Sequence, residues 1–218
     1  MQVRILGRDS ELAIVDAGAQ NGHTSAEYLD EFPNCRVIAL EPASDNFAIS
    51  GNRLTAYGGR ARLLPLGLSD RDGTADLHLT NHNGSHSLLT VNDVRYFDSP
   101  IRNTGREPIQ TVTLDRLCAQ HEIEMLDVLK MDIQGGELRA LHGAKAMLQR
   151  GAIRLIASEV LFQPLYSDQP TFWDIETYLR SYGYAFHGLY DVQYHKEHPA
   201  VLRWADAIFV APSLAKLP

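Results

Sequence analysis

Residues 12–22, LAIVDAGAQNG, constrain the fold of this chain more than any other segment. An apolar run ends at Asp16 and is followed by a loop that contains Gly18 and Gly22. An apolar run of this length, bounded by glycine, is typical of a buried parallel strand. Glycine lets the backbone turn tightly and lets a ligand approach the main chain. The segment therefore predicts a strand followed by a ligand-binding turn.

A short helix and a second strand are expected after this turn. Thr24 precedes Glu27 by three residues, which is the spacing of a capping box, and predicts a helix that runs through Phe32. The next apolar run, CRVIALEP at 35–42, carries Glu41 near its end. The order strand, glycine turn, helix, strand and acid predicts the first half of a nucleotide-binding α/β unit. In such a unit, Glu41 can accept hydrogen bonds from both hydroxyls of a ribose.

The glycine loop differs from the dinucleotide fingerprint G-x-G-x-x-G, because its pattern is D-x-G-x-x-x-G. Acidic residues also stand at the ends of later apolar runs, at Asp70, Asp132 and Glu159. The pyrophosphate of a dinucleotide is disfavoured by so many anions. The sulfonium and ammonium groups of S-adenosyl-L-methionine (SAM) suit them, and its carboxylate can lie against the glycine loop. SAM is therefore the expected ligand, and an NAD-linked oxidoreductase is the less favoured alternative.

Five segments follow one another in a fixed order: VDAGAQNG, ALEPASDNF, LPLGLSDRDG, VTLDRL and VLKMDIQGGELRALHGA. Together they resemble the FkbM family of SAM-dependent methyltransferases, over a stretch from about Leu12 to Pro212. The fifth segment corresponds to a family pattern close to K-x-D-x-E-G-x-E, whose positions are occupied here by Lys130, Asp132, Gln134, Gly135 and Glu137. Gln134 replaces the usual Glu, so this position carries no charge in this chain.

The resemblance implies an α/β protein with the Rossmann-like fold of class I methyltransferases. This fold has a seven-stranded, mostly parallel sheet with an antiparallel final strand, and helices on both faces. Further strands are expected at 61–69, 125–133 and 153–162, and a final pair at 185–195 and 203–212. A length of 218 residues predicts a single domain spanning 1–218. The polar, glycine-bearing stretch 81–110 predicts an insertion over the mouth of the site.

Residues at the predicted strand ends are assigned to the cofactor and the acceptor. Contact with SAM is expected from Asp16, Gly18, Asn21, Gly22, Glu41, Pro42, Ser69 and Asp70. The loop residues would hold the methionine side, and the resemblance places the adenine beside Ser69 and Asp70. Asp132 and Glu159 end adjacent predicted strands and are the catalytic candidates, expected to face the acceptor. His86 and Ser87, in the predicted insertion, are candidates for binding the substrate.

A divalent cation between Asp132 and Glu159 is a further alternative, because some O-methyltransferases use one. The sequence offers no clear third ligand, so no metal site is assigned.

Composition limits the partners and the compartment. The net charge is −7, and no block of Lys or Arg occurs, which argues against nucleic acid and anionic membranes as partners. Cys35 and Cys118 lie far apart in no metal or redox spacing, which fits a reducing compartment. The sequence has neither a secretory signal nor an apolar run of membrane-spanning length, and a cytoplasmic location is expected.

The resemblance implies methyl transfer from SAM to a hydroxyl of a sugar or secondary metabolite, as in natural product biosynthesis. The acceptor would be a small molecule, and the chain could form a homo-oligomer. A second hypothesis, from a different class, is a catalytically inactive SAM-binding protein with a regulatory or scaffold role.

Overall fold

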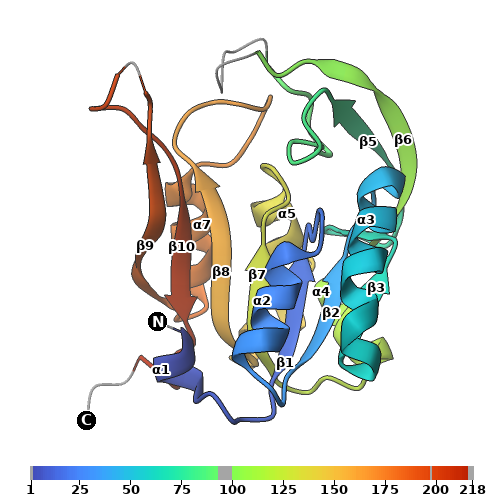
Figure 1. The fold of residues 1–218 in the computed structure, drawn as a ribbon. Coiled ribbons are helices and arrows are strands. Elements are labelled where there is room, and N and C mark those ends of the chain that lie inside the picture. The colour runs from blue at the N-terminus through green and yellow to red at the C-terminus, as the bar shows by residue number, and fades with distance from the viewer. Residues whose placement is uncertain (1, 93–99, 197, 216–218) are drawn as a thin grey trace.

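A central seven-stranded sheet organises the computed structural model, which describes residues 2–92, 100–196 and 198–215 (Figure 1). From one edge to the other, its strands are β3 (Ala61–Leu64), β2 (Arg36–Leu40), β1 (Ala13–Ala17), β7 (Leu126–Met131), β8 (Ile153–Leu161), β10 (Leu202–Val210) and β9 (Ala185–Tyr194). The first five strands pair in parallel, and β10 is antiparallel to both of its neighbours. The predicted mostly parallel sheet with an antiparallel final strand is therefore confirmed.

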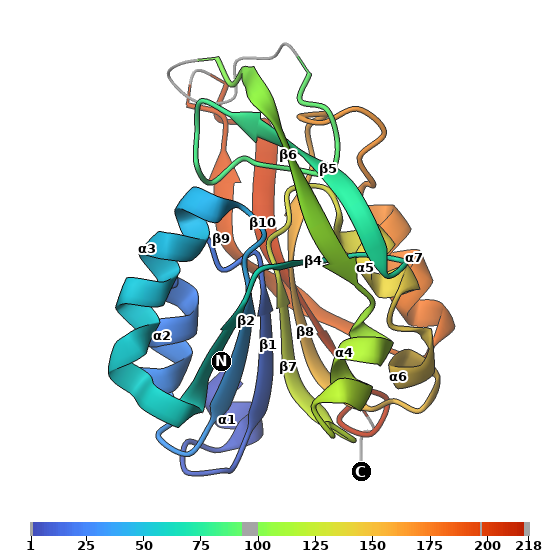
Figure 2. The ribbon, with the colours of Figure 1, turned by 90° about the vertical axis from the view of Figure 1, so that its right-hand side faces the viewer.

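Helices cover both faces of this sheet, as Figure 2 shows. One face carries α2 (His23–Glu31) and α3 (Ser44–Leu54), which is continued by a 3-10 helix at Thr55–Arg60. The other face carries α4 (Leu114–Gln120), α5 (Glu137–His142), α6 (Lys145–Gln149) and α7 (Phe172–Ser181). A short α1 (Gln2–Leu6) precedes β1. Because both faces are covered, the central strands are apolar on both sides, which explains the continuous apolar runs in the sequence.

The predicted third strand, 61–69, is divided into two strands. β3 ends before Pro65 and belongs to the central sheet, whereas β4 (Leu66–Leu68) belongs to a second, three-stranded sheet. Proline has no backbone N–H and interrupts a ladder of hydrogen bonds, so the chain can change sheets at this residue.

The second sheet has the order β4, β6 (Asn103–Val112), β5 (Gly73–Thr80). It lies beside the carboxyl ends of the parallel strands (Figure 1). The predicted insertion at 81–110 begins as a segment from Asn81 to Asn92, which we call the strap, and ends within β6. Positions 93–99 of the predicted insertion lie outside the described residues.

The start of α2 differs from the prediction. Gly22 is the N-cap, with φ 75°, and no side chain caps the helix at that residue. The backbone N–H of His23 instead donates to Asn21 Oδ1 at 3.0 Å. The predicted capping box of Thr24 and Glu27 is therefore wrong, because the helix already begins before Thr24.

Within the described ranges, no helix is long and apolar enough to cross a membrane.

Candidate functional site

Gly18 is required by the packing of the chain against itself. The backbone N–H groups of Gly18 and Ala19 both donate to the Leu40 carbonyl oxygen, at 3.0 Å, and so join the glycine loop to the end of β2. Gly18 has φ 82°, and a Cβ there would collide with the backbone carbonyl oxygen of Asp132. The loop thus rests on the residue that follows β7.

Glu41 lies at the end of β2 with only 4% of its surface exposed. Its carboxylate accepts hydrogen bonds from the backbone N–H of Gln20 at 2.7 Å and from that of Ala43 at 2.9 Å. Burial raises its pKa to about 7, although both N–H donors oppose this change. The glycine loop and the second strand therefore meet at a carboxylate that can exchange its proton near neutral pH.

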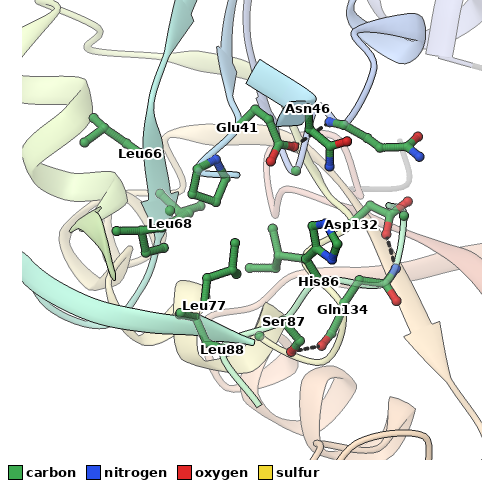
Figure 3. Close-up of a pocket in the computed structure, with 18 of the residues that line it drawn as sticks. Glu41, Asn46, Leu66, Leu68, Leu77, His86, Ser87, Leu88, Asp132 and Gln134 are labelled. Atoms are coloured by element: carbon green, nitrogen blue, oxygen red, sulfur yellow. Dashed lines mark hydrogen bonds between the residues drawn. The ribbon is translucent and has the colours of Figure 1, made fainter. Parts of the chain in front are cut away.

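A cavity of about 590 Å³, part of it open to solvent, lies between the glycine loop, the second sheet and the strap (Figure 3). Its polar lining comes from Gly18, Gln20, Glu41, Asn46, Asn83, His86, Ser87, Asp132 and Gln134. Its apolar lining comes from Pro42, Leu66, Leu68, Leu77, Leu88, Ile109 and Ile133. A cavity with an apolar wall and a few convergent polar groups is typical of a small-molecule site.

The structure brings six of the twelve predicted site residues to this cavity: Gly18, Glu41, Pro42, His86, Ser87 and Asp132. It also brings residues that the sequence analysis did not assign to the site. Gln20 and Asn46 flank Glu41, and Leu77 and Ile109 come from the second sheet. Gln20 stands inside the glycine loop and could have been noticed, whereas the contribution of the second sheet depends on the division of the third strand.

Three of the residues predicted to contact the cofactor, Asp16, Asn21 and Gly22, do not line the cavity and instead contact the neighbouring helices. Asp16 is 1% exposed and accepts a hydrogen bond of 2.6 Å from the Ser25 hydroxyl of α2. Burial raises its pKa. The Asn21 side chain accepts a hydrogen bond from the backbone N–H of His23, the first residue of α2, and a Cβ on Gly22 would come close to Ser50 of α3.

Ser69 and Asp70 do not line the cavity. The Ser69 backbone N–H donates to the Val112 carbonyl oxygen of β6, and its hydroxyl donates to Asp70 Oδ1 at 3.1 Å. Asp70 lies instead at a separate surface hollow with Arg139 and His142. The apolar wall of the cavity begins with the strand that precedes them, β4.

Both substrate-binding candidates of the strap reach the cavity. His86 Nδ1 accepts a hydrogen bond from the Thr80 backbone N–H at 3.1 Å, and burial lowers the pKa of His86. The Ser87 hydroxyl donates to the Gln134 carbonyl oxygen at 2.6 Å and accepts from the Leu89 backbone N–H at 2.9 Å. The strap is thereby fixed to the loop that follows β7.

The two catalytic candidates are brought together at the ends of adjacent strands. Asp132 directly follows β7, and Glu159 lies in β8. The Gln134 side-chain amide bridges them, because its Nε2 donates to Asp132 Oδ1 at 2.7 Å and to Glu159 Oε2 at 2.9 Å. Burial raises the pKa of Glu159 well above its ordinary value, and the negative charge of Asp132 adds to this effect. Asp132 lines the cavity, and Glu159 stands behind it.

Lys130 supplies positive charge beneath this pair. Its Nζ lies 3.7 Å from Asp132 Oδ2 and 3.5 Å from Asp206 Oδ1, and its side chain is only 9% exposed. Burial lowers the pKa of Lys130, but the charges of Asp132 and Asp206 outweigh burial, so the pKa is raised. Lys130 therefore stays a cation and offsets part of the negative charge at the ends of β7 and β8.

The described ranges contain no group of three or more His, Cys, Asp or Glu side chains that could hold a metal ion. A cation between Asp132 and Glu159 is not supported, because the Gln134 amide already bridges the two carboxylates.

Known proteins with the same sequence pattern identify the family. The model of the Methyltransferase FkbM domain matches residues 16–186, which is most of the chain. The chain belongs to the FkbM methyltransferase family. The matched region includes the glycine loop, Glu41 and the Asp132–Glu159 pair of this FkbM chain.

Two relatives of this FkbM chain carry methyltransferase names. It is 28% identical to 2-O-methyltransferase NoeI of Sinorhizobium fredii (strain NBRC 101917 / NGR234) over 72% of this chain and 66% of NoeI. It is also 28% identical to methyltransferase sdnD of Sordaria araneosa, over 60% of this chain and 59% of sdnD. The chain thus spans less than two thirds of the length of each of these two relatives.

Solved structures support the fold of the FkbM chain. Precorrin-6y C5,15-methyltransferase of Geobacter metallireducens GS-15 matches with a TM-score of 0.52 at 14% identity, over 96% of this chain and 84% of that one. The human methyltransferase 10 domain containing protein matches with a TM-score of 0.52 at 10% identity, over 97% of this chain and 78% of that one. The FkbM chain therefore has the class I methyltransferase fold.

Proposed function

We propose that this chain transfers a methyl group from SAM to a hydroxyl oxygen of a small-molecule acceptor, such as a sugar or a secondary metabolite. The observation that carries the proposal is the Asp132–Glu159 pair at a cavity that is also lined by Gly18 and Glu41. This arrangement puts a proton acceptor beside a site that has both an apolar wall and a buried carboxylate. The name of one relative, a 2-O-methyltransferase, agrees with transfer to oxygen.

The residues of the cavity suit the parts of SAM. Glu41 already accepts hydrogen bonds from two backbone N–H groups. Because each carboxylate oxygen has two lone pairs, it can accept further hydrogen bonds, and these would come from the ribose hydroxyls. Leu68, Leu77 and Ile109 would contact the adenine ring. Gly18 and Gln20 would lie at the methionine end. SAM, when bound, supplies a methyl group on a positively charged sulfur.

The acceptor side depends on the carboxylates of the chain. Asp132 can orient an acceptor hydroxyl by accepting its hydrogen bond, and it can then receive the proton of that hydroxyl. Gln134 and Lys130 hold Asp132 in place through a hydrogen bond and an ion pair, and the Gln134 amide links Asp132 to Glu159. Holding the acceptor oxygen in line with the methyl carbon is the larger part of such catalysis, since orientation removes most of the entropic barrier.

Two measurements test this proposal. Calorimetry with SAM, S-adenosylhomocysteine and NAD should show binding of the first two and none of NAD. Mass spectrometry of a panel of glycosides and phenols, incubated with SAM and the protein, should then detect one added methyl group on a hydroxyl. If the protein binds NAD and does not bind SAM, the proposal is contradicted and a dinucleotide-dependent enzyme is favoured. SAM binding with no methylated product across the panel would favour the inactive SAM-binding protein.

A further inference from the structure

A second hollow lies beside the cavity, on the face of the central sheet that carries α2. Its sides are formed by α2 and by the β9–β10 pair, and the buried residues Lys130 of β7 and Ala157 of β8 lie at its floor. In Figure 1, α2 lies in front of β1 and β7, and α1, which has only five residues, lies at the lower end of the sheet. The sheet is thus accessible between α2 and the last two strands.

The cavity and this hollow share one ion pair as their common wall. Asp132 lines the cavity, and Lys130, whose Nζ lies 3.7 Å from Asp132 Oδ2, lines the hollow. The same ammonium group lies 3.5 Å from Oδ1 of Asp206, which also lines the hollow. A molecule bound in the hollow would therefore lie close to Asp132 without occupying the cavity proposed for SAM.

Tyr28 offers this hollow a buried hydrogen-bond donor. Its side chain lines the hollow, the residue is only 8% exposed, and its hydroxyl oxygen accepts from Gln2 Nε2 at 3.1 Å. Burial raises the pKa of Tyr28 to about 12, so the hydroxyl keeps its proton. Among the residues that the structure describes, none accepts a hydrogen bond from this hydroxyl. A buried donor without an acceptor is costly, and an oxygen atom of a bound molecule would satisfy it.

Further polar groups of the hollow have hydrogen-bonding capacity left. Asp206 uses Oδ1 for Lys130, whereas Oδ2 has no partner in the described ranges, and the Tyr190 hydroxyl makes no hydrogen bond there either. A carboxylate accepts hydrogen bonds from hydroxyls, and a phenol can donate or accept one. The half-buried Tyr190 ring also offers an apolar surface to the C–H groups of a ligand. Hydroxyls next to C–H groups on one face are typical of a sugar.

The charge of the hollow restricts which sugars suit it. Glu27 of α2 and Asp191 of β9 lie on its two sides, and the Glu27 side chain is 65% exposed. Lys130 is the one cation among the described lining residues, and the carboxylates of Asp132 and Asp206 already pair with it. A phosphate or carboxylate group on a ligand would be repelled here, because like charges brought together at a binding site cost free energy.

We propose that this hollow binds the methyl acceptor, and that the acceptor is a sugar without negative charge. The inference rests on the proposed function, in which Asp132 receives the proton of the acceptor hydroxyl. Asp206 would accept a hydrogen bond from one sugar hydroxyl, and Tyr28 would donate to another. Glu27 and Asp191 would exclude phosphorylated sugars and uronic acids.

Sugar binding can be measured without turnover. Saturation-transfer NMR on protein saturated with S-adenosylhomocysteine should use methyl glycosides of neutral hexoses, pentoses and deoxyhexoses as probes, with D-glucuronate and glucose 6-phosphate as anionic counterparts. At least one neutral glycoside should bind, and neither anionic sugar should. Thr24→Trp, which fills the hollow from α2, should abolish this binding. Tyr28→Phe removes only the hydroxyl and should weaken binding by about threefold to tenfold.

Matched variants control for bulk, for the loss of a hydroxyl and for charge. Arg139→Trp adds the same ring at the separate surface hollow that contains Asp70, and Tyr194→Phe removes an exposed hydroxyl from β9. Both should bind the glycoside as wild type does. Glu27→Lys should raise the affinity for D-glucuronate by about threefold or more, whereas Glu124→Lys, with the same change of net charge at another exposed position, should leave it unchanged. SAM affinity should stay within a few-fold of wild type in every variant.

Three results would each overturn the proposal: no neutral glycoside binds, D-glucuronate binds as tightly as the best neutral glycoside, or Thr24→Trp and Tyr28→Phe both bind the glycoside as wild type does. The proposed function is tested separately. If Thr24→Trp is folded and methylates an acceptor at the wild-type rate, the acceptor lies elsewhere and the methyltransferase function stands. If the wild-type protein binds a glycoside in the hollow but transfers no methyl group to it or to any other acceptor, the methyltransferase function fails and the hollow is a sugar-binding site only.

Discussion

The Glu41 carboxylate accepts a hydrogen bond of 2.7 Å from the backbone N–H of Gln20, and this contact closes the glycine loop onto the end of β2. The carboxylate is thus part of the scaffold of the loop as well as a candidate ligand for ribose. Burial raises the pKa of Glu41 to about 7. In a large fraction of unliganded molecules, Glu41 is therefore protonated at and below neutral pH. Any ligand that needs the ionised form must displace that proton.

SAM binding should therefore release a proton near pH 6.5. Calorimetry in two buffers of different ionisation enthalpy should give different observed heats for wild type and equal heats for Glu41→Gln. SAM affinity should rise as the pH increases toward 7 and level above it, because the ionised carboxylate is then already present. Equal heats in wild type would contradict the role of Glu41.

Loss of the Glu41 carboxylate should weaken SAM binding more than turnover. Glu41→Ala should reduce the binding free energy by about 1.5–3 kcal/mol, the range for hydrogen bonds to a charged group. The rate at saturating SAM should change little, because the ribose contact is the same in the ground and transition states. A variant with normal SAM affinity and a greatly reduced rate would show that Glu41 acts on the acceptor instead.

Gly18→Ala should destabilise the protein as well as weaken SAM binding. The added Cβ would collide with the Asp132 carbonyl oxygen, and the residue would keep a positive φ. Overpacking and left-handed backbone together should lower the free energy of unfolding by about 2–4 kcal/mol. Gly59→Ala is the control, since no atom would lie within 4 Å of its Cβ. Urea denaturation measures the free energy of unfolding of both variants. Equal stability of Gly18→Ala and Gly59→Ala would contradict the packing role of Gly18.

Glu137 should make the unliganded protein less stable as the pH rises from about 4.5 to 7. It is 2% exposed and accepts a hydrogen bond from the Ile133 backbone N–H at 2.9 Å, and burial raises its pKa to about 7. The folded state therefore holds a proton that the unfolded state has already released in this range, and the free energy of unfolding falls by up to about 3 kcal/mol.

Glu137→Gln should remove this part of the pH dependence, because the amide resembles the protonated acid and does not titrate. Urea denaturation between pH 5 and pH 8 measures the effect. Glu124→Gln, at an exposed position, should keep the wild-type slope. If Glu137→Gln also keeps the wild-type slope of unfolding free energy against pH, the prediction is wrong and Glu137 is ionised in the folded protein.

Asp132→Asn should affect turnover far more than SAM binding. The amide keeps an oxygen that can accept from Gln134 Nε2 but cannot take the acceptor proton. SAM affinity should stay within a few-fold of wild type, and kcat should fall by roughly a hundredfold or more. Loss of SAM binding with a normal rate at saturation would assign Asp132 to the cofactor instead.

Long apolar runs and the glycine loop are local signals, and they were sufficient to predict the strands of the central sheet, whereas its arrangement beyond the parallel core was predicted from the family resemblance. The division at Pro65 was missed, although the proline itself is visible, because the choice between continuing one sheet and joining another depends on β6, about forty residues later. The helix start was missed because the N-cap is Gly22, which has a left-handed backbone (φ 75°) and no side chain to give a capping signal.

For the site, the sequence predicted acids at strand ends but not the directions in which they point. Asp16 turns toward α2 and Asp132 toward the cavity, a difference set by packing on either side of the sheet. Gln134 stood out as a departure from the family pattern. Its partners Ser87 and Tyr166 come from distant segments, and no local pattern could have named them.

The position of β10 between β8 and β9 has a consequence for synthesis on the ribosome. Residues 202–210 complete the sheet, yet the strands on both sides of them are made earlier. Until that last segment emerges, the edge of β8 that bears Glu159 presents unpaired backbone N–H and C=O groups, which invite pairing with other chains. A nascent chain that pauses after Tyr194 would therefore carry an open edge next to its own candidate catalytic acid.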